Sequence, residues 1–255
     1  MKNILVFIFV FTIGYCYSQQ KYTYKAIYEL SYKTDSTSNF YETSNFVLLI
    51  NNKESFFQNY NSYKRDSIKS QDIIASSSIV KDEIKTKINT KSIEVSQEFS
   101  GLKMYYVESI PNQWKITNNV IKFNEISCKE ATLNCYGRNW IAYFSEDYSF
   151  QFGPYLFSGL PGLIVKIEDD HHFYNFRLLS LKKEENTVKF DNSSKEISKI
   201  KYYQMIYDAF YSGNIFNSFK MQDANEQEAI RKKFMDRIKK LNNIPIDKTM
   251  RYIFD

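Results

Sequence analysis

The chain is poor in the residues that build metal centres and thiol chemistry: its 255 residues include three cysteines and two histidines. It contains no HExxH pair, no CxxC pair, and no GxSxG, P-loop or GxGxxG pattern. Carboxylates are abundant, but no pair of them stands in a setting typical of a glycosidase. The sequence therefore predicts no catalytic residue, no metal ligand and no cofactor, and it argues against an enzyme.

Glycine and proline are also scarce, with seven and four copies, and they are unevenly placed. Four glycines and two prolines fall within one short span of the chain: Gly137, Gly153, Pro154, Gly159, Pro161 and Gly162. Glycine supplies positive φ or close backbone approach, whereas proline fixes φ and removes a donor. Their concentration here indicates a backbone shape that the fold requires.

The first residues are typical of a secretory signal. Lys2 precedes the apolar run ILVFIFVFTIG (4–14), and polar residues follow it. Small residues at Cys16 and Ser18 suit the two recognition positions of a cleavage site, so we expect a mature chain that begins at Gln19. The alternative, a lipoprotein anchored through Cys16, is disfavoured because the bulky Tyr15 precedes it.

The apolar run is too short to span a bilayer, and no later segment is apolar enough, so the mature chain is expected to have no transmembrane span. The whole-chain charge of +5 falls to +4 when residues 1–18, with one lysine and no acid, are removed. This mild excess is spread along the chain and argues against a nucleic-acid partner. The predicted location is exported: the periplasm, the outer membrane or the medium.

Alternation of apolar and polar residues predicts a mainly β domain. Residues 21–33 place an apolar or aromatic side chain at every even position from Tyr22 to Tyr32, which indicates a half-buried strand. Residues 45–51 and 54–60 are typical of a hairpin. Further strands are predicted at 102–109, 114–118, 126–134, 138–145, 163–169 and 173–183.

Two other regions break this alternation. Residues 61–94 are rich in Ser, Lys and Asp and are interpreted as a mobile excursion with a short helix. Residues 202–213 and 225–243 have helical periodicity, and the second carries the stripe Ala229, Ile230, Phe234, Ile238 and Leu241. The predicted fold is α+β, mainly β: a single domain over 19–255, with an antiparallel sheet or half-barrel over 19–200 and a helical tail over 201–255.

Cys128 and Cys135 are the two cysteines of the mature chain, and they lie seven residues apart. On one continuous strand they would be about 23 Å apart at ~3.3 Å per residue, whereas a disulfide needs Cα atoms within about 7 Å. Unpaired cysteines are favoured, and a disulfide would require the segment to fold back.

The segment GLPGLI, Gly159 to Ile164, is the signature of the GLPGLI family of exported Bacteroidota proteins. Its surroundings resemble that family in order and spacing: SCKEAT (127–132), GRNWIAYFS (137–145), FGPYLFSGLPGLIVKIED (152–169) and KKLNNIPID (239–247). The resemblance covers most of the mature chain and implies an exported β-rich protein with no assigned activity. The strand pattern is also similar to periplasmic half-barrel carriers of lipids or lipoproteins, by analogy of fold.

Two interpretations of the 153–164 segment stay open: a buried turn that seats strand 163–169, which Gly and Pro favour, and a pocket rim or docking loop. Arg138 and Trp140 share one strand face, either as part of a recognition surface or, as favoured here, with Trp140 in the core and Arg138 extending to water. The candidate ligand or partner loop comprises Gly153, Pro154, Phe157, Gly159, Leu160, Pro161 and Gly162, with Arg138 and Trp140 beside it.

The segment EDDHH (168–172) holds both histidines beside three acids. Adjacent strand residues point to opposite faces, so a hairpin turn is favoured over a metal site.

The function expected from these observations is that of an exported, non-enzymatic protein of the cell envelope. The concave side of the half-barrel would hold a lipid or other apolar ligand, or a segment of a partner protein, with residues 153–164 at its rim. Two alternatives are a structural accessory of an outer-membrane receptor system, bound through a sheet edge or residues 61–94, and a metal-dependent hydrolase using residues 168–172.

Overall fold

The structure is a computed structural model, and it describes residues 18–68, 78–123, 125–190, 193–214, 216 and 224–253. The strands are β1 (Ser18–Tyr32), β2 (Glu42–Ile50), β3 (Glu54–Asn59), β4 (Glu83–Lys87), β5 (Ser92–Phe99), β6 (Leu102–Ser109), β7 (Lys115–Phe123), β8 (Ile126–Cys135), β9 (Arg138–Ser145), β10 (Leu163–Asp169), β11 (Tyr174–Phe190) and β12 (Lys195–Glu196). The helices are α1 (Tyr60–Ile68), α2 (Lys199–Phe210), α4 (Ala224–Lys239) and the 3₁₀ helix η1 (Lys248–Ile253).

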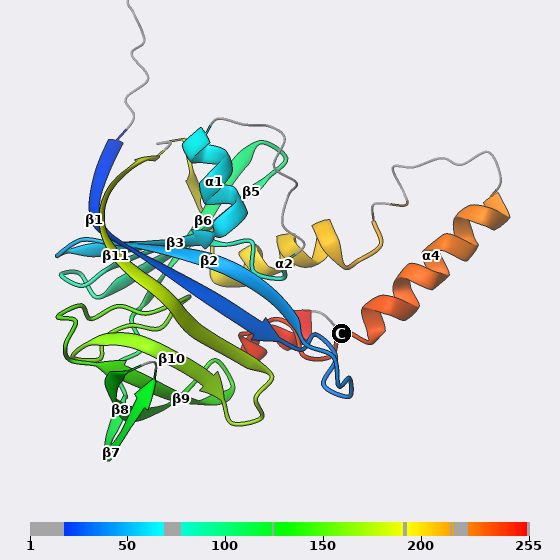
Figure 1. Cartoon of the computed structure of the whole chain (residues 1–255). Coiled ribbons are helices and arrows are strands. Elements are labelled where there is room, and N and C mark those ends of the chain that lie inside the picture. The colour runs from blue at the N-terminus through cyan, green and yellow to red at the C-terminus, as the bar shows by residue number, and fades with distance from the viewer. Residues whose placement is uncertain are drawn as a thin grey trace, which may run out of the picture.

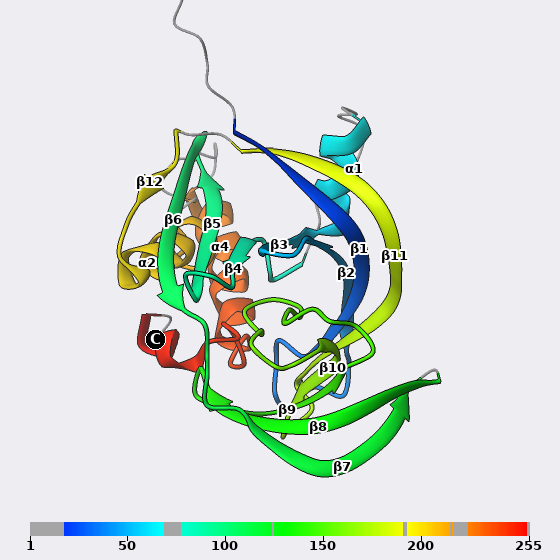
Figure 2. The same cartoon turned by 90° about the vertical axis from the view of Figure 1, so that its left-hand side faces the viewer.

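All twelve of these strands form one sheet, in the order β12-β6-β5-β4-β3-β2-β1-β11-β10-β9-β8-β7. Every pairing is antiparallel except that of β12 with β6. The sheet curves into an arc around a central space and does not close (Figures 1 and 2). The predicted fold class, a mainly antiparallel β half-barrel with helices near the C-terminus, is confirmed.

The long strand β1 shows why the arc has an apolar concave side. Ala26, Tyr28, Leu30 and Tyr32 are buried in the main core, and the intervening residues are half-buried, as the alternation predicts. A register shift between Tyr22 and Tyr24 changes the face that the earlier residues present. Even-numbered side chains from Ala26 onward therefore fill the concave side.

The hairpin β2–β3 is buried on both faces, which explains its uninterrupted apolar run. Phe46 and Phe57 stack at 4.9 Å between ring centroids in the main core. On the opposite face, Val47 and Phe56 belong to a second cluster that includes tyrosines of the short helix α1. Helix α1 thus covers part of the outer face of the sheet.

Part of the range 61–94 forms strands that the sequence analysis did not predict. The short helix is confirmed as α1, but β4 and the start of β5 also lie in this range and extend the sheet beyond β3. Their buried residues Ile84, Ile93 and Val95 alternate with polar ones, so two strands are hidden within a stretch that is polar in composition. Residues 69–77 and the predicted signal segment 1–17 lie outside the described residues.

The hairpin β8–β9 turns through Tyr136 and Gly137, whose φ angles are +55° and +68°. Positive φ at both central residues is the geometry of a two-residue type I′ hairpin turn. This turn packs against the C-terminal segment, since a Cβ on Gly137 would stand 2.9 Å from Cβ of Lys248.

The connection between β9 and β10, residues 146–162, folds inward and occupies the concave side of the arc (Figure 2). Phe152, Leu156, Phe157 and Leu160 are all at most 2 % exposed. The concave side of the half-barrel is therefore filled by side chains from the part of the chain that is richest in glycine and proline.

Helix α4 projects away from the sheet (Figure 1). The predicted stripe is only partly buried: Phe234 packs against Phe216 at 5.3 Å, whereas Ile230 is 38 % exposed. Leu241, predicted to belong to the stripe, lies beyond the end of the helix. Within the described ranges, no helix has the length and apolar character to cross a membrane.

The edge strand β7 carries features that disfavour pairing with another strand. A register irregularity lies between Ile116 and Val120, and Lys115 and Lys122 stand near its two ends. Bulges and lysines protect exposed sheet edges from further strand addition.

Gly162 is the position in the GLPGLI segment where the fold has no room for a side chain. A Cβ there would lie 2.3 Å from the carbonyl oxygen of Ser145, which is backbone at the end of β9. We expect Gly162→Ala to lower the free energy of unfolding by about 3 kcal/mol, because backbone must shift to relieve the clash. Urea denaturation measures this loss.

The matched control is Gly101→Ala. A Cβ at Gly101 meets no atom within 4 Å, so only its φ of +80° opposes the substitution and about 1 kcal/mol is expected. Equal losses in the two variants would contradict the close-approach explanation.

Candidate functional site

The candidate loop lies mostly in the core. Gly153, Pro154, Phe157, Leu160 and Gly162 are buried, whereas Gly159 and Pro161 are exposed. The ring of Phe157 stands 4.5 Å from that of Trp140, and Trp140 is fully buried. Burial supports the interpretation of this segment as a structural turn, while Tyr155 of the same segment lines the small cavity described below.

The favoured prediction is confirmed for Trp140, which lies in the core, but it is wrong for Arg138, which does not extend to water. Arg138 is 4 % exposed, and its Nη1 lies 3.3 Å from Oδ2 of Asp169, with both side chains 1 % exposed. Its Nε donates to the carbonyl of Ile246, and its Nη2 donates to the carbonyl and Oδ1 of Asn243. The C-terminal segment covers Arg138 and supplies acceptors for it, which the local strand pattern cannot show.

The predictions for cysteine and histidine can also be compared with the structure. Cys128 and Cys135 are both free, as expected, because β8 runs without a fold-back between them. Burial raises the pKa of the Cys128 thiol to about 11 and that of Cys135 to about 12, so neither is an activated nucleophile.

His171 and His172 lie in the turn after β10 with side chains more than 60 % exposed. The described residues contain no group of three metal-binding side chains.

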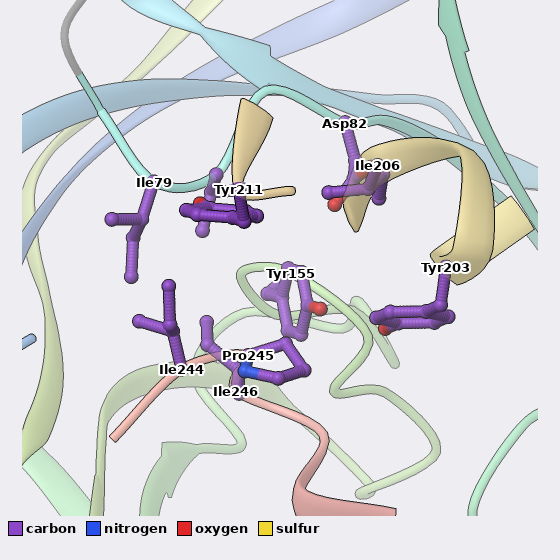
Figure 3. A pocket seen from close by; sticks show the side chains of 10 residues that line it. Ile79, Asp82, Tyr155, Tyr203, Ile206, Tyr211, Ile244, Pro245 and Ile246 are labelled. Atoms are coloured by element: carbon purple, nitrogen blue, oxygen red, sulfur yellow. The ribbon is translucent and has the colours of Figure 1, made fainter. Parts of the chain in front are cut away.

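A small cavity remains on the concave side, between α2, the residues before β4, the inward-folded connection and the C-terminal segment (Figure 3). Its volume is about 40 Å³, room for about three waters. Its wall combines three tyrosines, one carboxylate and several isoleucines: Tyr155, Tyr203, Tyr211, Asp82, Ile206 and Ile244 among them.

Local structure aims these side chains at the cavity. The hydroxyl of Ser198 accepts from the backbone N–H of Lys201 and caps α2, which starts the helix where Tyr202 and Tyr203 turn inward. Tyr155 follows Pro154 and has a φ of +55°, a conformation that costs a non-glycine residue free energy. The inward fold of the connection holds Tyr155 in this conformation.

The polar groups of the wall are incompletely paired. The hydroxyl of Tyr202 donates to Oδ1 of Asp82 at 2.6 Å. Tyr155 and Tyr203 are each 4 % exposed, and no hydrogen bond to their hydroxyls occurs in the described part of the chain. Burial raises the pKa of both tyrosines well above 10, so they remain protonated. Both residues line the cavity, so these two hydroxyls are available to bind a ligand or water.

Two carboxylates near this cavity share one lysine. Lys199 pairs with Glu108 at 2.6 Å and with Asp247 at 2.9 Å. Burial alone would lower the pKa of Lys199, but these two carboxylates raise it above its ordinary value. Asp82 has no ion pair with any described cation, and burial raises its pKa to about 6 despite the hydrogen bond from Tyr202.

The sequence analysis missed the residues of this cavity. Tyr155 lies in the 153–164 segment, but nothing in the sequence distinguishes it from the many other aromatic residues. Asp82 lies in the range 61–94, which was predicted to be an excursion. Tyr203 and Tyr211 belonged to a predicted helix whose partner was unknown. The one available signal was the dense tyrosine content of 202–211.

Comparisons with known proteins address the fold. No protein-family model and no curated protein matches the chain. Two solved structures are similar to it: PNGF-II in the P21 space group, with a TM-score of 0.54, and PNGF-II in the C2 space group, with a TM-score of 0.55. Both are 14% identical, and each match covers 74% of this chain but only 34% and 33% of the PNGF-II chain. The chain thus shares its fold with about a third of PNGF-II.

Breaking the buried pair of Arg138 should be costly. We expect Arg138→Met to lower the free energy of unfolding by about 3–5 kcal/mol, because it leaves Asp169 buried without its cation. The double variant Arg138→Met/Asp169→Asn should recover part of this loss, since the uncompensated charge is removed. Urea denaturation of both variants gives the comparison.

The exposed pair of Arg177 with Glu29, at 2.9 Å, is the control, and Arg177→Met should cost less than about 1 kcal/mol. A loss of the same small size for Arg138→Met would show that the buried pair does not hold the C-terminal segment.

Asp82 should make the folded protein less stable as the pH rises. Its pKa is raised from 3.8 to about 6 on folding, so the folded protein holds this proton more tightly than the unfolded chain. The penalty for burying the ionised carboxylate is absent below pH 3.8 and fully present above about pH 6. We expect the stability of the wild type relative to Asp82→Asn to fall by about 3 kcal/mol between those limits. Urea denaturation at a series of pH values measures the difference, and a pH-independent difference would contradict the shift.

Proposed function

We propose that this protein is an exported, non-enzymatic binding protein that holds a small ligand in the cavity between α2 and the C-terminal segment. The observation that carries the proposal is that Tyr155 and Tyr203 line this cavity and that their hydroxyls have no hydrogen bond in the described part of the chain. An unpaired buried hydroxyl is costly, so a polar group is expected to occupy the space beside it.

The volume of the cavity limits the ligand. About 40 Å³ suits a molecule of a few non-hydrogen atoms, not the acyl chain of a lipid. The expectation of an apolar ligand in the half-barrel is therefore narrowed to a small molecule with an apolar part against the isoleucines and a polar part against Asp82 and the tyrosines.

Binding without catalysis agrees with the chemistry of the wall. The two tyrosines that lack a partner keep their protons because burial raises their pKa values, and the cavity wall has no histidine or cysteine. Export follows from the apolar segment 4–14 and its cleavage pattern, and it belongs to the proposal.

The test is native mass spectrometry of the protein purified gently from its own cells, followed by extraction of whatever is bound. We expect a discrete added mass on the wild type, and a chain that begins at Gln19. Ile206→Phe fills the cavity and should abolish the added mass.

Ile200→Phe makes the same substitution on the exposed side of the same helix, where Ile200 is 57 % exposed, and should leave the added mass unchanged. A wild-type protein without bound mass, or an added mass that survives Ile206→Phe, would overturn the cavity as the binding site. A chain that retains residues 1–18 would overturn export.

A further inference from the structure

Asp82 is a carboxylate that has no cationic partner among the described residues. Asp82 is half-buried in the cavity wall (Figure 3), and its one side-chain hydrogen bond among the described residues comes from the hydroxyl of Tyr202. A buried carboxylate is normally paired with a cation or hydrogen-bonded by several donors. In this region Lys199 is already shared between Glu108 and Asp247. The cavity therefore has an unmet requirement for positive charge.

The hydroxyls of Tyr155 and Tyr203 determine which kind of cation would fit the cavity. The hydroxyl oxygens of Tyr155 and Tyr203 can each accept a hydrogen bond, so a cation that carries N–H donors satisfies them and Asp82 together. A bare metal ion would find too few oxygen ligands, because hard cations such as Ca²⁺ require six to eight. A quaternary ammonium ion has no N–H and would leave the hydroxyls unpaired.

The rest of the wall suits an alkyl group beside the charge. Ile79, Ile206 and Ile244 provide apolar surface, and tyrosine rings attract cations through their faces. This protein uses the same attraction nearby: the ammonium of Lys199 lies 5.5 Å from the ring centre of Tyr106 and 5.1 Å from that of Tyr136.

We infer that the cavity binds a small primary or secondary alkylammonium ion, with its nitrogen between Asp82, Tyr155 and Tyr203 and its alkyl part against the isoleucines. This inference rests on the proposed function and names the chemistry of its ligand.

The pH dependence of binding depends on Asp82 alone. The titratable groups that act on it from other elements are tyrosines: Tyr106 of β6, Tyr155 of the inward-folded connection, and Tyr202, Tyr203 and Tyr211 around α2. Burial raises the pKa of all five tyrosines, so they stay protonated and uncharged at neutral pH. Glu108 and Asp247 are held by Lys199, and neighbouring Lys81 points its ammonium at the ring of Phe210.

The experiment is a titration of the purified protein, labelled with ¹³C at isoleucine δ1 methyl groups, with n-propylammonium chloride up to about 50 mM, since so small a ligand binds in the millimolar range. The neutral probe 1-propanol has the same number of non-hydrogen atoms. We expect saturable shifts of the Ile79, Ile206 and Ile244 signals with propylammonium and at least tenfold weaker binding of propanol. The signal of exposed Ile200 should not move.

Two variants and a change of pH test the role of charge. Asp82→Asn should weaken propylammonium binding at least tenfold, and Asp208→Asn on the exposed side of α2 should not change it. Lowering the pH from about 7.5 to about 5 should weaken binding roughly tenfold, because Asp82 is then mostly protonated while the ligand keeps its charge. If Asp82→Asn does not fold, Tyr203→Phe, which keeps the ring and removes the hydroxyl, should weaken binding at least threefold.

The outcomes separate this inference from the proposed function. Equal binding of propanol and propylammonium, both lost in Ile206→Phe, would overturn the preference for a cation and leave the cavity as a small-ligand site. Absence of saturable shifts with either probe would overturn the inference and count against the cavity as a binding site. Cation binding that is indifferent to both Asp82→Asn and pH would place the ion elsewhere and overturn the assignment.

Discussion

The buried guanidinium of Arg138 joins the sheet to the C-terminal segment, and the concave side of the protein depends on this junction. Arg138 leaves the start of β9, pairs with Asp169 at the end of β10, and donates to carbonyls of Asn243 and Ile246. Its guanidinium also lies 4.5 Å from the ring centre of Tyr174. Because a buried cation must have its donors satisfied, the segment 243–247 is held where those carbonyls are required.

The C-terminal segment in turn closes the cavity. Ile244, Pro245 and Ile246 form part of its wall, opposite α2 (Figure 3). Asp247 then pairs with Lys199 at the start of α2, so the same short segment contacts the sheet on one side and the helix on the other. The hydrogen bonds of Arg138 and the ion pair of Lys199 thus hold this segment between the sheet and the helix.

The inward-folded connection determines how much space is left. Residues 146–162 fill most of the arc with Phe152, Leu156, Phe157 and Leu160, and Gly162 brings the chain back against Ser145 with no room for a Cβ. These residues thus occupy much of the concave side of the sheet. What remains is a small chamber whose wall combines aromatic rings, the carboxylate of Asp82 and the hydroxyls of Tyr155 and Tyr203.

The sequence by itself determined the local elements: the alternation in β1, the hairpin β2–β3, the turn at Tyr136 and Gly137, and the singular shape of the glycine-rich segment. These features depend on neighbours within a few residues, which periodicity and turn chemistry report. Only the tertiary structure decided that Arg138 is buried, that the glycine-rich segment fills the arc, and that Asp82, Tyr155 and Tyr203 line one cavity. Those outcomes depend on which distant segments pack together, and burial by a partner more than a hundred residues away leaves no trace in the local pattern of either segment.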